Sequence, residues 1–123
     1  MALGKYKSIS AVLYGLEQEI ASELAAALAA CGHRVNTING TQKSGCDSLQ
    51  RADIIFCRAE VSQVQELKGE FPESPVVVAS RIPEVSDWLD ALEAGASDYC
   101  AAPFEPAQIR WVLRSHVPQY ATA

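Results

Sequence analysis

Residues 91–106 read ALEAGASDYCAAPFEP, and this stretch contains the end of one helix, a short strand and the start of another helix. Gly95 is a natural stop for the first helix, because glycine readily adopts the left-handed conformation that ends helices. The run at residues 98–101 is short and largely apolar, as expected of a strand. Pro106 suits the first turn of a helix, where its missing N–H has no intrahelical partner in any case. The stretch therefore predicts a helix–strand–helix unit.

The same alternation of strand and helix continues towards the N-terminus. Apolar runs predict four further strands, at residues 8–14, 34–38, 53–57 and 75–80. Apolar side chains at helical spacing predict helices over residues 17–30 and 61–71. Two later helices are expected to turn inward Val85, Trp88, Leu89 and Leu92 after Pro83, and Ile109, Val112 and Leu113 after Pro106. Residues 39–50 are expected to form a loop with one weak helix.

Strands that alternate with helices predict a parallel sheet that is covered on both faces. Because crossovers between parallel strands are right-handed, five such units predict a doubly wound α/β fold. We expect a single domain over residues 1–123, with a core from about 8 to 117 and a polar tail at 118–123. Ligands of such folds bind at the carboxyl ends of the strands. The positions of interest are therefore residues 14–18, 57–60, 80–82 and 101–103.

Composition excludes several classes of protein. Of 123 residues, 49% are hydrophobic and 20% are charged, an ordinary globular balance that argues against disorder. The net charge of -5, with Lys and Arg scattered, argues against a nucleic-acid-binding surface. The N-terminus has no apolar run typical of a signal peptide, and residues 24–31 are too few to span a bilayer. We therefore expect a cytoplasmic protein that does not bind a membrane.

The cysteines do not form a metal-binding pattern. Cys31, Cys46, Cys57 and Cys100 lie far apart in the sequence, and His33 and His116 add no close spacing. Zinc sites normally need paired, closely spaced ligands, so no metal site is expected. Cys57 and Cys100 are expected to be buried free thiols that behave as small hydrophobic residues.

The segment Ala-Gly-Ala, Asp-Tyr and Pro-Phe within residues 94–104 resembles the corresponding segment of bacterial response-regulator receiver domains. The run Pro-Val-Val-Val-Ala-Ser at 75–80 is similar to the fourth strand of that family. The resemblance covers nearly the whole chain. It implies a flavodoxin-like, three-layer α/β/α fold with strand order 2-1-3-4-5 and a role in two-component phosphorelay signalling.

The same resemblance locates the phosphorylation pocket, and most of its functional positions are altered. The family places two acids where this chain has Gly15 and Leu16, so that Glu17 is the nearest acid. The position of the phosphate-accepting Asp is Arg58. A Lys is replaced by Ala102, directly before Pro103. Ser80 matches the hydroxyl position, and Tyr99 matches an aromatic residue that changes rotamer on activation in the family.

These replacements predict a degenerate receiver that is not an enzyme. Arg58 cannot form an acyl phosphate, and without paired acids the pocket lacks the oxygen ligands that Mg²⁺ prefers. No cofactor or metal is therefore expected. We expect Arg58 to fill the pocket and to pair with Glu17. By resemblance, the Ala102–Pro103 peptide bond is expected to be cis.

Interaction with a partner protein, or between two copies of the chain, is the expected activity. By resemblance, it would use a face built by the fourth helix, the fifth strand and the fifth helix. That face would carry Trp88, Tyr99, Arg110, Trp111 and Arg114. Plainer structural roles compete with these functions. Ser80 would then bond local backbone, and Tyr99 would be half-buried packing with its hydroxyl at the surface.

Three alternatives stay open. The old pocket could sense a small ligand, the chain could be phosphorylated at an unusual position, or it could be a small flavodoxin-like enzyme. Against an enzyme, the sequence has no G-x-G-x-x-G motif, no P-loop and no pair of carboxylates with a plausible base.

Overall fold

A computed structural model describes residues 9–38, 51–81 and 85–117 of the chain. The expected weak helix in residues 39–50, the helix start at Pro83 and the tail at 118–123 lie outside these ranges. The strands are β1 (Ser10–Tyr14), β2 (Arg34–Ile38), β3 (Ile54–Cys57), β4 (Val76–Ser80) and β5 (Asp98–Ala101). The helices are α1 (Gln18–Ala30), α3 (Val61–Glu70), α4 (Val85–Ala94) and α5 (Pro106–His116).

The strands form one parallel sheet in the order β2-β1-β3-β4-β5, as predicted. β3 is buried at all four positions and β4 at four of five, because helices cover both faces of the sheet centre. Their unbroken apolar sequence follows from this double cover. β2 and β5 lie at the two edges and are more exposed.

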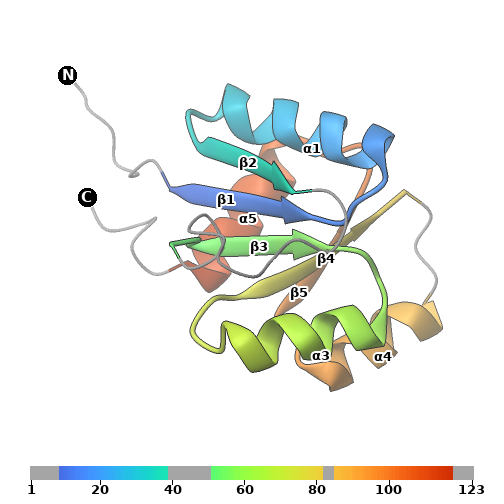
Figure 1. Ribbon diagram of the computed structural model, residues 1–123. Coiled ribbons are helices and arrows are strands. Elements are labelled where there is room, and N and C mark those ends of the chain that lie inside the picture. The colour runs from blue at the N-terminus through green and yellow to red at the C-terminus, as the bar shows by residue number, and fades with distance from the viewer. Residues whose placement is uncertain (1–8, 39–50, 82–84, 118–123) are drawn as a thin grey trace.

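Helices α1 and α5 lie on one face of the sheet, and α3 and α4 lie on the other (Figure 1). A hydrophobic core lies on each face. In one, Leu24 and Leu28 of α1 and Ile109 and Leu113 of α5 pack around Phe56. The other joins residues of α3 and α4 to the opposite side chains of the same strands. The chain is therefore a three-layer α/β/α structure, which confirms the predicted fold class.

Two glycines end helices, Gly32 after α1 and, as expected, Gly95 after α4. Gly32 has φ +88° after α1, and Gly95 has φ +121° after α4. In each case the next residue donates its N–H five residues back, from His33 to Leu28 and from Ala96 to Ala91. This is the hydrogen-bond pattern of a Schellman motif, in which a left-handed residue turns the chain sharply away from the helix. These turns direct the chain into β2 and β5.

The expected apolar face of α4 is wrong in part. Ala91 is fully buried, whereas Trp88 is 36% exposed and Leu89 is 54% exposed. α4 packs against α3 and covers the sheet near its β5 edge, so one flank of the helix has no described layer over it. Apolar spacing identified the helix but not the flank that the fold leaves uncovered.

None of the helices in the described ranges is long and apolar enough to cross a membrane. Cys57 and Cys100 are buried free thiols, as predicted, and Cys31 is partly exposed.

Candidate functional site at the carboxyl edge of the sheet

A pocket of about 250 Å³ lies at the carboxyl ends of β1, β3 and β4. Parallel strands end at the same edge of a sheet, so the loops that follow them meet there. Three of the residues singled out by sequence, Glu17, Arg58 and Ser80, line this pocket together. Its remaining lining residues are Leu16, Ile20, Ala59, Glu60, Ala79 and Arg81.

Ala102, the fourth residue singled out for this site, is not among the lining residues. It is partly buried and packs against the core between the sheet and the α1–α5 layer. Its peptide bond with Pro103 is cis, as predicted.

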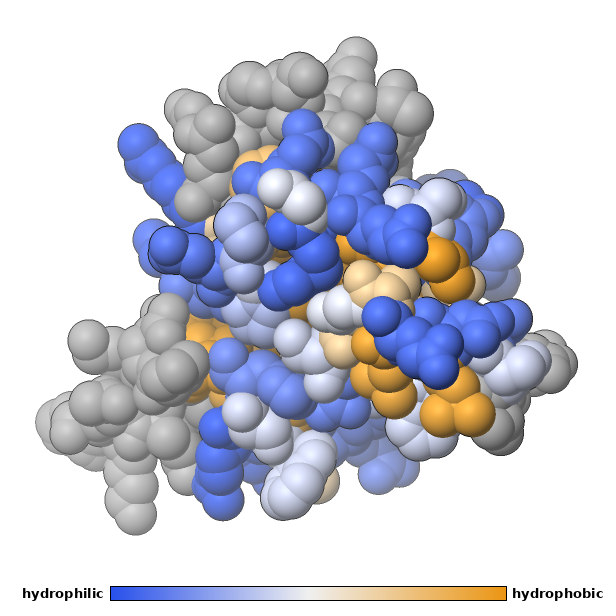
Figure 2. Space-filling view, turned by 90° about the horizontal axis from the view of Figure 1, so that it is seen from below, coloured by the Kyte–Doolittle hydropathy of each residue, from blue (hydrophilic) through white to orange (hydrophobic). Residues whose placement is uncertain are grey.

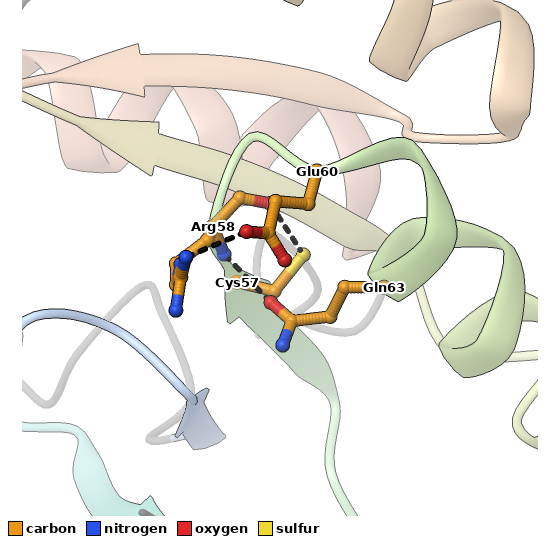
Figure 3. A network of polar contacts seen from close by, with 4 residues as sticks. All are labelled: Cys57, Arg58, Glu60 and Gln63. Atoms are coloured by element: carbon orange, nitrogen blue, oxygen red, sulfur yellow. Dashed lines mark hydrogen bonds and ion pairs between the residues drawn. The ribbon is translucent and has the colours of Figure 1, made fainter. Parts of the chain in front are cut away.

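Arg58 pairs with Glu60, and the expected pair with Glu17 is wrong. A guanidinium nitrogen of Arg58 lies 2.6 Å from Oε2 of Glu60 (Figure 3). The backbone explains this choice, because the Glu60 N–H donates to the Arg58 carbonyl over 2.8 Å and folds the loop back on itself. The two side chains are 49% and 47% exposed, so the pair stabilises the fold by only about 0–1 kcal/mol.

The loop that carries Arg58 is held by further local bonds (Figure 3). The Arg58 N–H donates to Oε1 of Gln63 on α3 over 3.0 Å. The Cys57 thiol donates to the Arg58 carbonyl over 3.4 Å. Burial, together with the nearby charge of Glu60, raises the pKa of Cys57 to about 12. The thiol is therefore neutral near pH 7 and is no nucleophile.

A second arginine at the pocket has a partner that the sequence did not reveal. Arg81 directly follows β4 and lies 2.6 Å from Glu23 of α1. The hydrogen bond to Glu23 raises the pKa of Arg81 above its ordinary value. Arg81 is among the positions of interest because it follows a strand, at the edge where ligands of such folds bind. No spacing could indicate Glu23, because 58 residues separate the two in sequence.

A chain of side-chain contacts runs from the pocket to the surface of α4. The Ser80 hydroxyl lies 2.8 Å from the Tyr99 hydroxyl. The Tyr99 ring stacks on Trp88, with ring centroids 5.0 Å apart and an interplanar angle of 27°. The Tyr99 side chain is partly buried, as the plainer expectation has it, and its hydroxyl is bonded to Ser80. The pocket-lining Ser80 is thus connected to a partly exposed indole on α4.

The expected interaction face has exposed aromatic side chains on both sides of β5. Trp111 of α5 is 66% exposed and Trp88 of α4 is 36% exposed. Arg110 and Arg114 of α5 are exposed as well. The face over α3 and α4 is largely hydrophilic, with hydrophobic side chains in separate patches (Figure 2). Tryptophan is enriched among the residues that carry most of the binding energy of interfaces, so the exposed Trp88 and Trp111 are candidate contact points.

No family model matches the chain. A stretch of 54 residues is 43% identical to "Probable transcriptional regulator ycf27" of Porphyridium aerugineum and covers 41% of this chain and 22% of that protein. The receiver domain of NtrX from Brucella abortus is 21% identical, with a TM-score of 0.72, over 88% of this chain and 98% of that one. The beryllofluoride-activated NtrC4 receiver domain dimer is also 21% identical, with a TM-score of 0.69, over 91% and 99%.

This chain therefore has the fold of response-regulator receiver domains. It spans about a fifth of the curated relative that it matches. A fold hosts many functions, so the site has to carry the functional argument.

Proposed function

We propose that this chain is a receiver-like signalling module that acts by protein–protein contact and is not phosphorylated on an aspartate. The observation that carries this proposal is Arg58, which lines the carboxyl-edge pocket directly after β3 and is bonded to Glu60. Phosphoryl transfer to a protein carboxylate needs a carboxylate oxygen as nucleophile. A guanidinium stays protonated and cannot take that role.

The other groups of the pocket support the same conclusion. Its carboxylates are Glu17 and Glu60, and Glu60 is already bonded to Arg58. With Arg58 and Arg81 also in the lining, the two negative charges are balanced by two positive ones. A Mg²⁺ ion prefers a cluster of oxygen ligands with excess negative charge. We infer that the pocket uses internal ion pairs in place of a metal and a phosphoryl group.

The contacts of Tyr99 support a contact function that does not depend on phosphorylation. By resemblance, the aromatic residue at this position changes rotamer on activation, and the hydroxyl residue at position 80 responds to the phosphoryl group. Here the two hydroxyls are bonded to each other, and Trp88 covers the ring of Tyr99. We infer that the face formed by α4, β5 and α5 is held in one conformation.

A second copy of the chain is the proposed partner, in the cytoplasm. The NtrC4 receiver domain of similar fold is described as a dimer. The residues proposed for contact are Trp88, Tyr99, Arg110, Trp111 and Arg114. Trp111 is the strongest anchor among them, since a large aromatic side chain that is 66% exposed can bury much area on contact.

Intact-mass analysis after incubation with acetyl phosphate and Mg²⁺ tests the absence of phosphorylation. We expect no mass increase in this chain, whereas a receiver domain with the usual acidic pair, Asp and Lys is labelled under the same conditions. Stoichiometric labelling of this chain on an aspartate would overturn the proposal.

Ligand sensing is a second candidate function, because the pocket is open and has charged side chains in its lining. Its space of about 250 Å³ and the guanidinium groups of Arg58 and Arg81 suit a small molecule that carries an anionic group. Chemical-shift changes confined to residues 58–60 and 79–81 on titration with small carboxylates and phosphates would favour this function over a pure contact module.

A further inference from the structure

Among the described residues, one side of β5 has no neighbouring strand, because β5 is the last strand of the sheet that they form. In a strand, successive residues direct their backbone N–H and C=O groups to opposite sides. The Ala102 N–H donates to the Ser80 carbonyl, towards β4. The N–H groups of Tyr99 and Ala101 therefore point to the open side, where a peptide strand could add to the sheet.

The peptide groups of Ala101 are already bonded to a side chain of α5. The Ala101 N–H donates to Oε1 of Gln108 over 3.0 Å. The Gln108 amide nitrogen donates back to the Ala101 carbonyl over 3.2 Å and to the Pro103 carbonyl over 3.3 Å. Gln108 thus supplies an acceptor for the Ala101 N–H and a donor for the Ala101 carbonyl, as a neighbouring strand would.

The N–H of Tyr99 is bonded in the same way by a carboxylate. It donates to Oδ1 of Asp98 over 2.7 Å. The other oxygen of Asp98 lies 2.8 Å from Nε2 of His116, near the end of α5. Both side chains of that pair are about three-quarters buried, with 24% and 27% exposed. α5 therefore determines the position of both groups that bond the open side of β5.

We propose that Gln108, together with Asp98 held by His116, closes the open edge of β5 against strand addition. Exposed edge strands pair readily with other chains, and proteins limit this by short edge strands and by covering the edge. β5 has four residues, and both of its outward N–H groups have side-chain acceptors. An extended peptide could add to the sheet only by breaking these bonds.

The closed edge also defines how the proposed interaction face is used. This second statement rests on the proposed function, whereas the closure of the edge does not. Gln108 and Trp111 are three residues apart on α5, so they lie on adjacent positions of one helix flank. Because the backbone of β5 is occupied, a partner meets exposed side chains of the proposed contact face, such as Trp111 and Trp88, and not the strand itself.

Hydrogen exchange of single backbone amides, measured by NMR, tests the closure. In Gln108→Ala we expect the Ala101 amide to exchange at least about tenfold faster, while the Tyr99 amide changes little, because each has its own acceptor. Asp98→Ala should accelerate Tyr99, and Asp98→Asn should do so less because it keeps an acceptor oxygen. Ser115→Ala, an exposed change on α5, is the matched control.

An unchanged exchange rate of the Ala101 amide in Gln108→Ala would overturn the closure. A folded spectrum of each variant, together with the per-residue rates, separates local opening from global loss of stability.

Light scattering then tests the second statement, that a partner contacts side chains and not the β5 backbone. We expect Gln108→Ala to associate through strands and to keep associating in a Gln108→Ala/Trp111→Ala double variant. Association of the unmodified chain should be weaker in Trp111→Ala, and association of unchanged strength there would contradict contact through side chains.

Discussion

The hydroxyl of Ser80, at the end of β4, lies 2.8 Å from the hydroxyl of Tyr99 on β5. The two residues are 19 apart in sequence, and Tyr99 in turn stacks on Trp88 of α4. A group that lines the carboxyl-edge pocket is therefore in direct contact with the aromatic pair beside the β5 edge. In the proposed function this contact holds the interaction face in one state.

Removing that hydrogen bond should lower stability moderately. We expect Tyr99→Phe to reduce the free energy of unfolding by about 0.5–1.5 kcal/mol, because the ring still packs against Trp88 and one partly buried bond is lost. Urea unfolding measures the change. Ser80→Ala should cost a similar amount, and the double variant should cost clearly less than the sum, because both changes remove the same bond. Full additivity would show that the two hydroxyls act independently.

Arg58 should contribute little to stability. Its partner Glu60 is about half exposed, so we expect Arg58→Ala to change the free energy of unfolding by at most about 1 kcal/mol. Arg58→Asp should not become phosphorylated by acetyl phosphate with Mg²⁺, since Gly15, Leu16 and Ala102 would still replace the other functional groups. Rapid labelling of Arg58→Asp would mean that the pocket retains more of the receiver chemistry than we propose.

The pocket should bind Mg²⁺ negligibly at millimolar concentration. Glu17 and Glu60 are its carboxylates. Glu60 is bonded to Arg58, and the charge of Glu17 acts on Arg81. An NMR titration measures this through the amide shifts of residues 16–17 and 58–60. Saturable shifts in the millimolar range at these positions would contradict the prediction, provided that they are absent when KCl of equal ionic strength replaces the magnesium salt.

Stability should fall as the pH falls below about 6.5, in part because of His33. Burial lowers the pKa of His33 below its ordinary value of 6.5, and the Ile9 N–H donates to its Nδ1. The folded state therefore binds the proton less readily than the unfolded state does. The stability that neutral His33 contributes is present above pH 6.5 and is lost as the pH falls towards its lower folded pKa. Urea unfolding between pH 5 and pH 8 measures the slope, and His33→Gln should flatten it.

Trp111 should matter for association and not for folding. Because its side chain is 66% exposed, we expect Trp111→Ala to change the free energy of unfolding by at most about 0.5 kcal/mol. Sedimentation analysis should show weaker self-association of this variant. Leu113→Ala provides the contrast on the same helix, since Leu113 is fully buried and its truncation should cost about 2–5 kcal/mol. Unchanged association in Trp111→Ala would remove Trp111 from the proposed contact face.

The sequence by itself determined the order of the elements and the layers of the fold. Strands buried on both faces, such as β3 and β4, need continuous apolar runs, and helices that cover a sheet need a periodic apolar stripe. Gly32 and Gly95 mark helix ends because few other residues adopt their backbone conformation. The burial of Cys57 and Cys100 followed from the same patterns. The strand ends then placed Glu17, Arg58 and Ser80 at one pocket.

The tertiary structure alone decided which side chains meet. Glu17 and Arg58 follow the neighbouring strands β1 and β3, which is why the sequence suggested that they pair. The turn of the loop that carries Arg58 instead brings Glu60 to within 2.6 Å of it. Arg81 and Glu23 pair across 58 residues, and Asp98 reaches His116 through the packing of α5 beside β5. Trp88 and Leu89 are apolar at helical spacing, yet the edge position of α4 leaves them exposed. Periodicity indicates which element forms and roughly which side of it is apolar. The layers that cover it, the ion pairs and the edge contacts depend on the packing of the fold, on loop paths and on side-chain rotamers, which leave no period in a sequence.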